Sequence, residues 1–256
     1  MTETIRAGRR KKAAAKAVSR TAAATTATAT PGVPPTATAA ITDLFAEACR
    51  LRLLCGLEEL LGQCGFARIA GVDEAGRGSL AGPVVAAAVV VDPRYAIPGV
   101  DDSKCLTAAE RERLAAVIRR SALASAVVAV DPGVIDSINI LEATRKAMVG
   151  ALRALSPRPD CAVIDAVRLR GLRFPCLPVV RGDAISYAIA SASILAKVER
   201  DRMMVALHRR YPQYGFADHK GYSVPEHLAA LRTYGPSPVH RLTYRPVVPR
   251  LPEGAC

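Results

Sequence analysis

Three short apolar runs set the strongest limit on how this chain can fold. Residues 66–72, 84–91 and 124–130 are each seven or eight residues long and have the composition of β-strands. A glycine-rich segment, residues 73–83, joins the first two runs. The chain is therefore expected to fold around a β-sheet.

Helical patterns alternate with strands further along the chain. Thr107-Ala-Ala-Glu110 forms a capping box, because the Thr hydroxyl and the Glu carboxylate can each satisfy a free backbone N–H, and it predicts a helix to about Arg120. The remaining predicted elements are a helix over 139–155, a buried strand over 161–164, a long helix over 184–210 and a short helix over 225–234. This order predicts an α/β fold with a mixed sheet flanked by helices and a helical C-terminal part.

The first 41 residues differ in composition from the rest. They consist mainly of Ala, Thr, Pro and basic residues, with no apolar period that could offset the entropy of ordering, and we expect a disordered basic tail over 1–41. An organellar transit peptide is the alternative, but Glu3 and the compact basic block at residues 9–12 fit it poorly. An apolar helical period predicts a helical lead-in over 42–65, and residues 66–250 form the expected main domain.

The charge balance favours a polyanionic partner. The chain has 35 Lys and Arg against 23 Asp and Glu, a net charge of +12, of which residues 1–41 supply +6 from seven basic residues and one Glu. The other +6 lies on the remaining residues and is typical of a nucleic-acid-binding protein.

Cysteine usage and hydropathy bear on the compartment. The seven cysteines are odd in number and include no Cys-x-x-Cys pair, which argues against a disulfide framework and a zinc site. We expect a reducing, cytoplasmic location in which the thiols act as small apolar side chains.

The longest apolar stretch, residues 80–91, is 12 residues long and contains Gly82 and Pro83, whereas a membrane span needs about 20 apolar residues. No membrane span is expected.

Four acidic residues stand out by their position beside apolar sequence. Asp73 and Glu74 directly follow the predicted strand 66–72, Asp165 directly follows the strand 161–164, and Asp183 precedes the long helix, which it could also cap. Carboxylates that emerge from strand ends can converge on Mg²⁺ or Mn²⁺, and two such ions about 3.5–4 Å apart can activate a water against a phosphodiester. The alternative is a set of strand-end caps and surface charges.

The glycine-rich segment resembles two nucleotide-binding loops only in part. Arg77 and Gly78 stand where a phosphate-binding loop needs Lys and Ser or Thr, and a strand rather than a helix follows. The spacing of Gly76, Gly78 and Gly82 does not fit a dinucleotide fingerprint. These glycines could instead let the backbone approach a sugar or phosphate closely, or simply form a tight hairpin corner.

Several basic and aromatic residues could bind the phosphates and bases of a nucleic acid. Tyr222 lies beside glycine in the basic sequence His219-Lys-Gly-Tyr222, where its ring could stack on a sugar or base, although an ordinary packed Tyr is an equal alternative. For Lys104 the alternative is a solvated charge. The candidates for phosphate contact are Arg77, Ser103, Lys104, Lys197 and the 219–222 loop.

Taken together, the motifs resemble ribonuclease HII. They follow the family's order from about Arg68 to Val247, roughly 70% of the chain, and they are Gly71-Val-Asp-Glu-Ala-Gly-Arg-Gly78, Leu80-Ala-Gly-Pro-Val84, Asp102-Ser-Lys104, Gly182-Asp183, Ala192-Ser-Ile-Leu-Ala-Lys-Val198, His219-Lys-Gly-Tyr222 and Pro236-Ser-Pro-Val-His-Arg241. The resemblance implies a ribonuclease H-like fold and an endonuclease that uses Mn²⁺ or Mg²⁺. Such an enzyme cuts the RNA strand of RNA–DNA hybrids or nicks 5′ of ribonucleotides in duplex DNA, leaving 3′-hydroxyl and 5′-phosphate ends. A role in removing ribonucleotides from DNA follows, with no obligate protein partner.

The resemblance also assigns roles to single residues. Asp73, Glu74, Asp165 and Asp183 match the family's four catalytic, metal-binding carboxylates. The substrate-binding residues it implies are Gly76, Arg77 and Gly78, which match the loop that senses the ribose 2′-hydroxyl, Tyr222 at the RNA-to-DNA junction, and Ser103 and Lys104 near phosphate. Lys197 is added to the substrate-binding residues as a basic side chain that could hold a phosphate. The chain departs from the family where Ala166-Val167 replaces the frequent Gly-Asn, Cys105 replaces a second Lys and Ser79 replaces a frequent Pro. None of these departures removes a carboxylate.

Two other functions remain open on sequence grounds. A resolvase or integrase would also cluster carboxylates, and a duplex with one ribonucleotide compared with its all-DNA twin would separate it from a ribonucleotide sensor. A non-catalytic nucleic-acid binder would use the charge of +12 for binding and its acids for structure. Cleavage that depends on Mg²⁺ or Mn²⁺ would exclude that reading.

Overall fold

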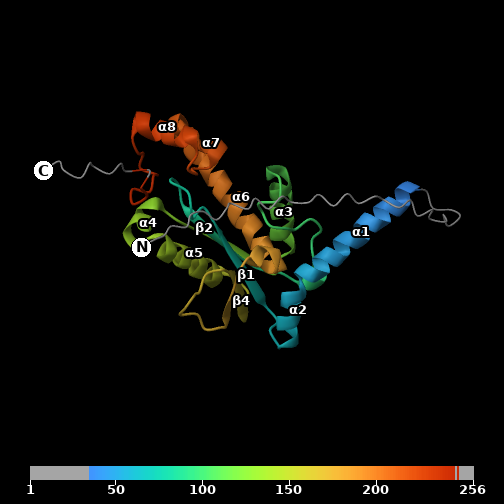
Figure 1. The fold of residues 1–256 in the computed structure, drawn as a ribbon. Coiled ribbons are helices and arrows are strands. Elements are labelled where there is room, and N and C mark those ends of the chain that lie inside the picture. Colours follow the sequence, from blue (N-terminus) through green and yellow to red (C-terminus); the bar gives the residue numbers. More distant parts are fainter. Residues whose placement is uncertain (1–34, 246, 248–256) are drawn as a thin grey trace, which may run out of the picture. The chain divides into compact units, whose positions relative to one another are not determined.

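A computed structural model describes residues 35–245 and 247 of the chain. Its centre is one five-stranded mixed sheet with the strand order β3-β2-β1-β4-β5 (Figure 1). The strands are β1 (Ile69–Ala75), β2 (Val84–Val90), β3 (Ala124–Val130), β4 (Cys161–Asp165) and β5 (Cys176–Val179). The expected mixed sheet is therefore confirmed, with a helical part at its C-terminal side.

The pairing of β1 determines where the acidic residues lie. β1 is central and runs antiparallel to β2, with Ala70 opposite Val90 and Ala75 opposite Val85. It runs parallel to β4, with Val72 beside Ile164. Because parallel strands end at the same edge of a sheet, the last residues of β1 and β4 lie close together.

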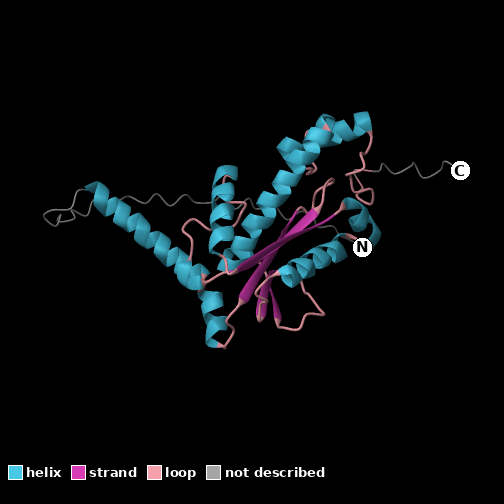
Figure 2. Cartoon of the chain, turned by 180° about the vertical axis from the view of Figure 1, so that it is seen from behind, coloured by secondary structure: helices cyan, strands magenta, loops and turns pink. Residues whose placement is uncertain are grey.

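Helices cover both faces of the sheet (Figure 2). Helix α6 packs on β1 and β2 with α3 beside it, and α5 packs on β2 and β3 from the other side. The α-helices are α1 (Pro35–Leu54), α2 (Gly56–Gln63), α3 (Ala108–Ser121), α4 (Pro132–Ile138), α5 (Ile140–Ala154), α6 (Tyr187–Arg210), α7 (Phe216–His219) and α8 (Pro225–Tyr234), and the short 3-10 turns are η1 (Pro93–Tyr95), η2 (Gly182–Ala184) and η3 (Pro212–Tyr214).

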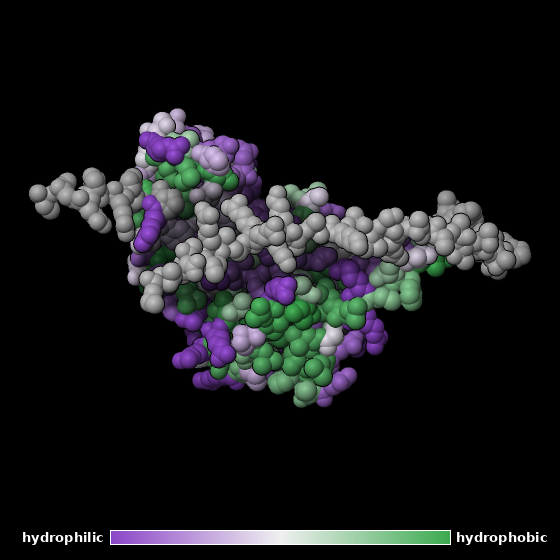
Figure 3. Space-filling model, in the orientation of Figure 1, coloured by the Kyte–Doolittle hydropathy of each residue, from purple (hydrophilic) through white to green (hydrophobic). Residues whose placement is uncertain are grey.

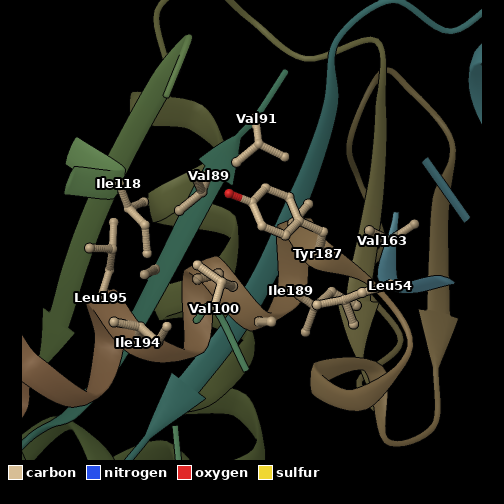
Figure 4. Packing of buried hydrophobic residues seen from close by; sticks show 14 of the residues in the cluster. Leu54, Val89, Val91, Val100, Ile118, Val163, Tyr187, Ile189, Ile194 and Leu195 are labelled. Atoms are coloured by element: carbon tan, nitrogen blue, oxygen red, sulfur yellow. The ribbon is translucent and has the colours of Figure 1, made fainter. Parts of the chain in front are cut away.

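One close crossing fixes α6 against the central strand. A Cβ built on Gly71 of β1 would lie 2.0 Å from the backbone carbon of Ala188 in α6, so only glycine fits at this crossing. Figure 4 shows the core on this face, where Ile189, Ile194 and Leu195 of α6 pack with Val89 of β2. The crossing places the first half of α6 beside the acidic end of β1.

The expected lead-in is part of the same core. Leu54 at the end of α1 is buried with Ile189 and Val163. In α2 the buried Glu58 accepts hydrogen bonds from the Ser186 hydroxyl and, at 2.9 Å, from the Ala188 N–H at the start of α6. Helix α2 thus caps the N-terminus of α6.

The structure corrects several sequence-based boundaries. β1 begins at Ile69 rather than Phe66 and continues through Asp73 and Glu74, so these acids lie within the strand instead of following it. The helix expected from residue 184 begins at Tyr187, because residues 182–184 form η2. Helix α4 and strand β5 were not predicted, whereas β3, α8 and the Thr107–Glu110 capping box are confirmed.

Three further expectations meet the structure only in part. Helix α1 begins at Pro35, ahead of the expected start at residue 42, and the rest of the proposed tail, residues 1–34, lies outside the described residues. Cys55 and Cys161 are buried and Cys176 is partly buried, but Cys49, Cys64 and Cys105 are exposed, so the expectation that the thiols act as small apolar side chains is wrong for these three. In the described part of the chain, no helix is both long and apolar enough to span a membrane.

Candidate active site

The C-terminal edge of β1 and β4 brings three predicted carboxylates into electrostatic contact. Asp73 and Glu74 occupy adjacent positions of β1, and Asp165 is the last residue of β4. The charge of Asp165 acts on both β1 carboxylates. Parallel pairing of two distant segments therefore assembles this edge, as the strand-end argument predicts.

Asp183 reaches the same place from η2. The preceding residue, Gly182, donates its N–H to Asp165 Oδ1 at 2.8 Å, so the turn is tied directly to the end of β4. The charge of Asp183 acts on Asp165 in turn. The structure thus brings together all four acids that the sequence singles out.

Burial and mutual repulsion shape the protonation of these acids. Burial is the largest cause that raises the pKa of Asp73, which is 5% exposed, and the neighbouring Glu74 charge raises it further. Burial also raises the pKa of Glu74, against the lowering effect of Arg77. Burial raises the pKa of Asp165, against the Gly182 N–H bond that lowers it. The edge therefore concentrates negative charge that the fold does not fully compensate.

Lys104 is one of the cations that the fold places among these acids. Its Nζ lies 2.9 Å from Asp183 Oδ2 and 3.4 Å from Asp102 Oδ1. The hydrogen bond to Asp183 is the main cause that raises the pKa of Lys104, and the lysine charge in turn lowers the pKa of Glu74 and Asp165. Lys104 is thus paired at the site rather than simply solvated.

Ser103, which the resemblance places near phosphate, is buried beside α6. It is 5% exposed, and its hydroxyl lies 2.9 Å from the Ser193 hydroxyl of α6. Ser193 in turn hydrogen-bonds Asp73 and lowers its pKa. The described contacts of Ser103 therefore connect it to the carboxylate edge through Ser193.

The Gly76–Gly78 loop follows β1 and is fixed from inside by Arg241, which is fully buried. Its Nη2 donates to the Gly76 carbonyl at 2.7 Å and its Nη1 to the Arg77 carbonyl at 2.8 Å. The Tyr244 hydroxyl also donates to the Arg77 carbonyl at 2.8 Å. The Arg77 side chain reaches back to Glu74 Oε1 at 3.4 Å.

The two glycines of this loop have different surroundings. Gly76 has a φ of +93°, and a Cβ there would lie 1.9 Å from Nε of Arg200, which is itself fully buried. A Cβ on Gly78 would meet no heavy atom within 4 Å among the described residues. Gly76 is therefore required by the fold, whereas Gly78 leaves open space beside the carboxylate edge.

Tyr222 lies next to this loop. The Leu80 N–H donates to the Gly221 carbonyl at 2.8 Å, which joins the glycine-rich segment to the 219–222 loop. The Tyr222 ring is 37% exposed and lies 5.4 Å from the Arg200 guanidinium carbon and 5.9 Å from Lys197 Nζ. Lys197 is paired with Asp201 at 2.8 Å. Two cations therefore lie against the Tyr222 ring, and part of the ring stays exposed to solvent.

A chain of neutral histidines holds the Tyr222 backbone. The Ser237 N–H donates to His240 Nδ1 at 2.9 Å, so the His240 proton lies on Nε2 and is donated to His227 Nε2 at 3.0 Å. The His227 proton then lies on Nδ1 and is donated to the Tyr222 carbonyl at 2.9 Å. Burial lowers the pKa of His240 to about 4 and also lowers the pKa of His227, which keeps both rings neutral.

The carboxylate edge suits divalent cations by its chemistry. Glu74 Oε2 is buried and has no hydrogen-bond partner among the described residues, and hard carboxylate oxygens are the ligands that Mg²⁺ and Mn²⁺ prefer. No three His, Cys, Asp or Glu side chains within residues 35–245 and 247 already stand as a metal-ligand set. Binding an ion would therefore require the carboxylates to turn towards a shared point.

Comparison with known proteins agrees with this architecture. The profile of the Ribonuclease HII family matches residues 70–247. Ribonuclease HII of Geobacillus thermodenitrificans is 54% identical over 194 residues, which cover 74% of this chain and 73% of that protein. Ribonuclease HII of Ruminiclostridium cellulolyticum is 48% identical over 195 residues, 76% of each chain.

The chain belongs to the ribonuclease HII family. The resemblance found in the motifs is thus confirmed, and with it the reaction class, a hydrolytic endonuclease of the ribonuclease H type. Solved structures agree on the fold. The ribonuclease H2 of Pyrococcus horikoshii superposes with a TM-score of 0.63 at 29% identity over 71% of this chain and 95% of that one. The ribonuclease HII of the Archaeoglobus fulgidus PCNA:RNase HII complex gives 0.59 at 28% identity, over 70% of this chain and 96% of that one.

Sequence reasoning missed the buried side chains that support the candidate site of this ribonuclease HII. Arg200 and Arg241 are fully buried, and Arg200 donates to the Pro83 carbonyl at 3.1 Å and the Ala81 carbonyl at 3.2 Å. In the sequence Arg200 stands in the basic half of a helix, which is typical of a solvent-facing surface. Arg241 and His240 fall within a motif that carried the resemblance, but nothing local indicates that they are buried.

Proposed function

We propose that this enzyme is a metal-dependent endoribonuclease that cuts the RNA strand of RNA–DNA hybrids and nicks 5′ of single ribonucleotides in duplex DNA. The products would carry 3′-hydroxyl and 5′-phosphate ends, as expected for a role in removing ribonucleotides from DNA. The observation that carries the proposal is the carboxylate edge of β1 and β4, whose crowded acids have raised pKa values. The loop that follows β1 leaves open space at Gly78.

The four carboxylates would hold the divalent cations together. Asp73, Glu74, Asp165 and Asp183 would bind Mg²⁺ or Mn²⁺ through their oxygens, and such ions supply an activated water and a charge that stabilises the leaving oxygen. The Gly182 N–H holds Asp165 in place through its 2.8 Å bond, and the Glu74 N–H holds Asp73 through a bond of 2.7 Å. These backbone bonds hold one oxygen of Asp165 and one oxygen of Asp73.

Other residues of the chain would position the nucleic acid. The open space at Gly78 allows a ribose to approach the backbone beside the acids, which is the basis for sensing a 2′-hydroxyl. Lys104 stands at the same edge with a positive charge that can meet a phosphate near the cleavage point. Tyr222, through its half-exposed ring, would stack on a base or sugar next to the junction.

Three duplexes of one sequence test the proposal: an RNA–DNA hybrid, a DNA duplex with one ribonucleotide, and the all-DNA duplex. With Mg²⁺ or Mn²⁺ the enzyme should cut the first two and leave the third intact, and chelation of the metal should stop both reactions. Mapping the cut ends should give a nick 5′ of the ribonucleotide. Cleavage of the all-DNA duplex, or cleavage in excess chelator, would contradict the proposal.

A further inference from the structure

Two adjoining clefts on the α5 side of the sheet share a strongly basic lining. The first, of about 810 Å³, lies between α5 and the loop 166–175 that joins β4 to β5, and the second, of about 460 Å³, lies between the end of α5 and the same loop. Their basic lining residues, called here the basic face, are Arg145, Lys146, Arg153, Arg158, Arg168, Arg170 and Arg173. Glu142 is the one acidic residue in these two linings.

The loop 166–175 alternates between apolar and basic side chains. Leu169 and Leu172 are partly buried against the core on this side of the sheet, as is Phe174. Arg168, Arg170 and Arg173 stand between them and are exposed. Hydrophilic side chains accordingly project in Figure 3 from the region where Figure 1 draws α5 and this loop. The apolar residues thus anchor the loop while the arginines face solvent.

The basic face holds an unusual share of the charge. It carries seven cations and one carboxylate, a net charge of +6, which equals the net charge of all residues from 42 to the C-terminus. Arg145 forms an ion pair with Glu142. For the other six cations, no carboxylate among the described residues lies within the 4.0 Å of an ion pair. The positive and negative charges of the other residues from 42 to the C-terminus therefore cancel. Nearby carboxylates do not neutralise the basic face.

The basic face starts at the edge of the carboxylate site. Asp165 ends β4, and Arg168 follows it by three residues along the chain. Ile138 at the end of α4 also lines the first cleft. Asp136 of the same helix accepts the Leu242 N–H at 2.8 Å, directly after Arg241, which holds the Gly76–Gly78 loop. Helix α4 and the loop 166–175 therefore each connect the first cleft to the site by a short stretch of chain.

We propose that the basic face binds the sugar–phosphate backbone of the substrate duplex to one side of the cleavage position. This inference rests on the proposed function, because it assumes a nucleic-acid duplex at the carboxylate edge. Arginine suits the partner, since its planar guanidinium can donate two hydrogen bonds to one phosphate. A protein partner is a poorer match, because protein interfaces are typically anchored by aromatic residues. The one aromatic residue in these two linings, Phe174, is already partly buried in the core.

The test removes charge from the face and, separately, from the opposite side of the sheet. The face variant combines Arg168→Gln, Arg170→Gln and Arg173→Gln. The matched control combines Arg52→Gln, Arg113→Gln and Arg120→Gln on α1 and α3, which are also exposed and lose the same charge. Binding of the full chain to an RNA–DNA hybrid is measured in chelator, which prevents cleavage, at several salt concentrations. Melting curves confirm that both variants fold.

The two variants should differ in how strongly their affinity for the hybrid depends on salt concentration. Each phosphate contact contributes about 0.9 to the slope of log affinity against log salt, so the face variant should lose about 2–3 from that slope and at least about 10-fold in affinity near 0.1 M salt. The control variant should lose less than about 1 from the slope. At saturating hybrid and Mg²⁺, the control variant should keep the parent's turnover rate, because its three arginines lie away from both the basic face and the carboxylate edge.

Equal slopes for the face variant and the control would overturn the proposal and would point instead to an acidic protein as the partner of this face. The proposed function is judged separately by whether the parent cuts the hybrid with Mg²⁺ or Mn²⁺. If the parent cuts and the slopes are equal, only the basic face has been misassigned. If the parent cuts neither the hybrid nor the ribonucleotide duplex, the proposed function itself fails.

Discussion

The carboxylate edge and the support of the Gly76–Gly78 loop adjoin each other, and both bury charged groups, yet they differ in how those charges are compensated. At the edge, burial and like charges raise the pKa of Asp73 and Asp165, and Glu74 Oε2 has no described partner. Beneath the loop, the guanidinium of Arg241 donates to the carbonyls of Gly76, Arg77 and Gly82 at 2.7–3.1 Å.

This difference separates function from stability. Uncompensated carboxylates destabilise the folded chain, but they are suited to a cation that arrives with the substrate. The satisfied arginine stabilises the loop and leaves its outer surface at Gly78 free. Substitutions at the edge should therefore abolish activity with little loss of stability, and substitutions beneath the loop should do the reverse.

The largest effect is expected at the edge. Asp165→Asn keeps the shape of the side chain and removes the charge that would hold a divalent ion, so cleavage of the hybrid should be abolished at saturating Mg²⁺ while binding of the hybrid in chelator stays near that of the parent. A gel assay of both quantities on one preparation suffices. Near-normal turnover would show that Asp165 is not a ligand.

Beneath the loop, Arg241→Met should mainly reduce stability. It removes the buried donor of the Gly76 and Gly82 carbonyls and leaves the Arg77 carbonyl with the Tyr244 hydroxyl. We expect a loss of about 3–5 kcal/mol in the free energy of unfolding, measured by urea denaturation. The control, Arg232→Met on the exposed face of α8, should change it by less than about 0.5 kcal/mol. Comparable losses for the two variants would contradict the assigned role of Arg241.

Gly76 and Gly78 belong to the same loop, but a substitution at Gly76 should reduce stability and one at Gly78 should reduce activity. Gly76→Ala places a Cβ against Arg200 at a φ of +93° and should lower the melting temperature clearly. Gly78→Ala meets nothing within 4 Å of the described structure, so it should melt like the parent. Its Cβ would occupy the space that the ribose needs, and it should cut a single-ribonucleotide duplex about 10-fold more slowly or worse, which corresponds to about 1.4 kcal/mol or more. Unimpaired cutting by Gly78→Ala would show that the ribose does not approach there.

The smallest effect concerns the histidines behind Tyr222. Because burial lowers the pKa of His240 to about 4 from an ordinary value near 6.5, its contribution to stability is fully present above pH 6.5 and is lost as the pH falls towards 4. One proton changes the free energy of unfolding by at most about 1.4 kcal/mol per pH unit. His240→Asn should flatten the pH dependence of the free energy of unfolding between pH 6.5 and 5, measured in urea titrations. An unchanged slope would show that His240 does not contribute to this pH dependence.

Local sequence was enough to predict some elements and not others. β3 and the capping box of α3 depend on neighbouring residues, so their patterns are visible in the chain. β5 is four residues long, contains Pro178 and is partly exposed, and it is a strand because it pairs with β4. The continuation of β1 through its acids likewise depends on pairing with β2, since carboxylates disfavour a strand on propensity alone.

The candidate site shows the same division. Convergence of Asp73 and Asp165 could be predicted, because acids at the ends of parallel strands meet at one edge. The partners of Lys104 and Ser103 could not, because Asp183 and Ser193 lie on segments remote in the sequence. The burial of Arg241 depends on carbonyls more than 150 residues away, for which no local pattern exists.

If the carboxylate edge lowers stability until a divalent cation binds, removing one of its charges should relieve that cost. The decisive measurement is the melting temperature of the parent and of Asp73→Asn over a series of Mn²⁺ concentrations. We expect Asp73→Asn to melt at or above the parent's temperature without metal, and Mn²⁺ to raise the melting temperature of the parent far more than that of the variant. A variant that melts well below the parent without metal, or that gains as much from Mn²⁺, would contradict it.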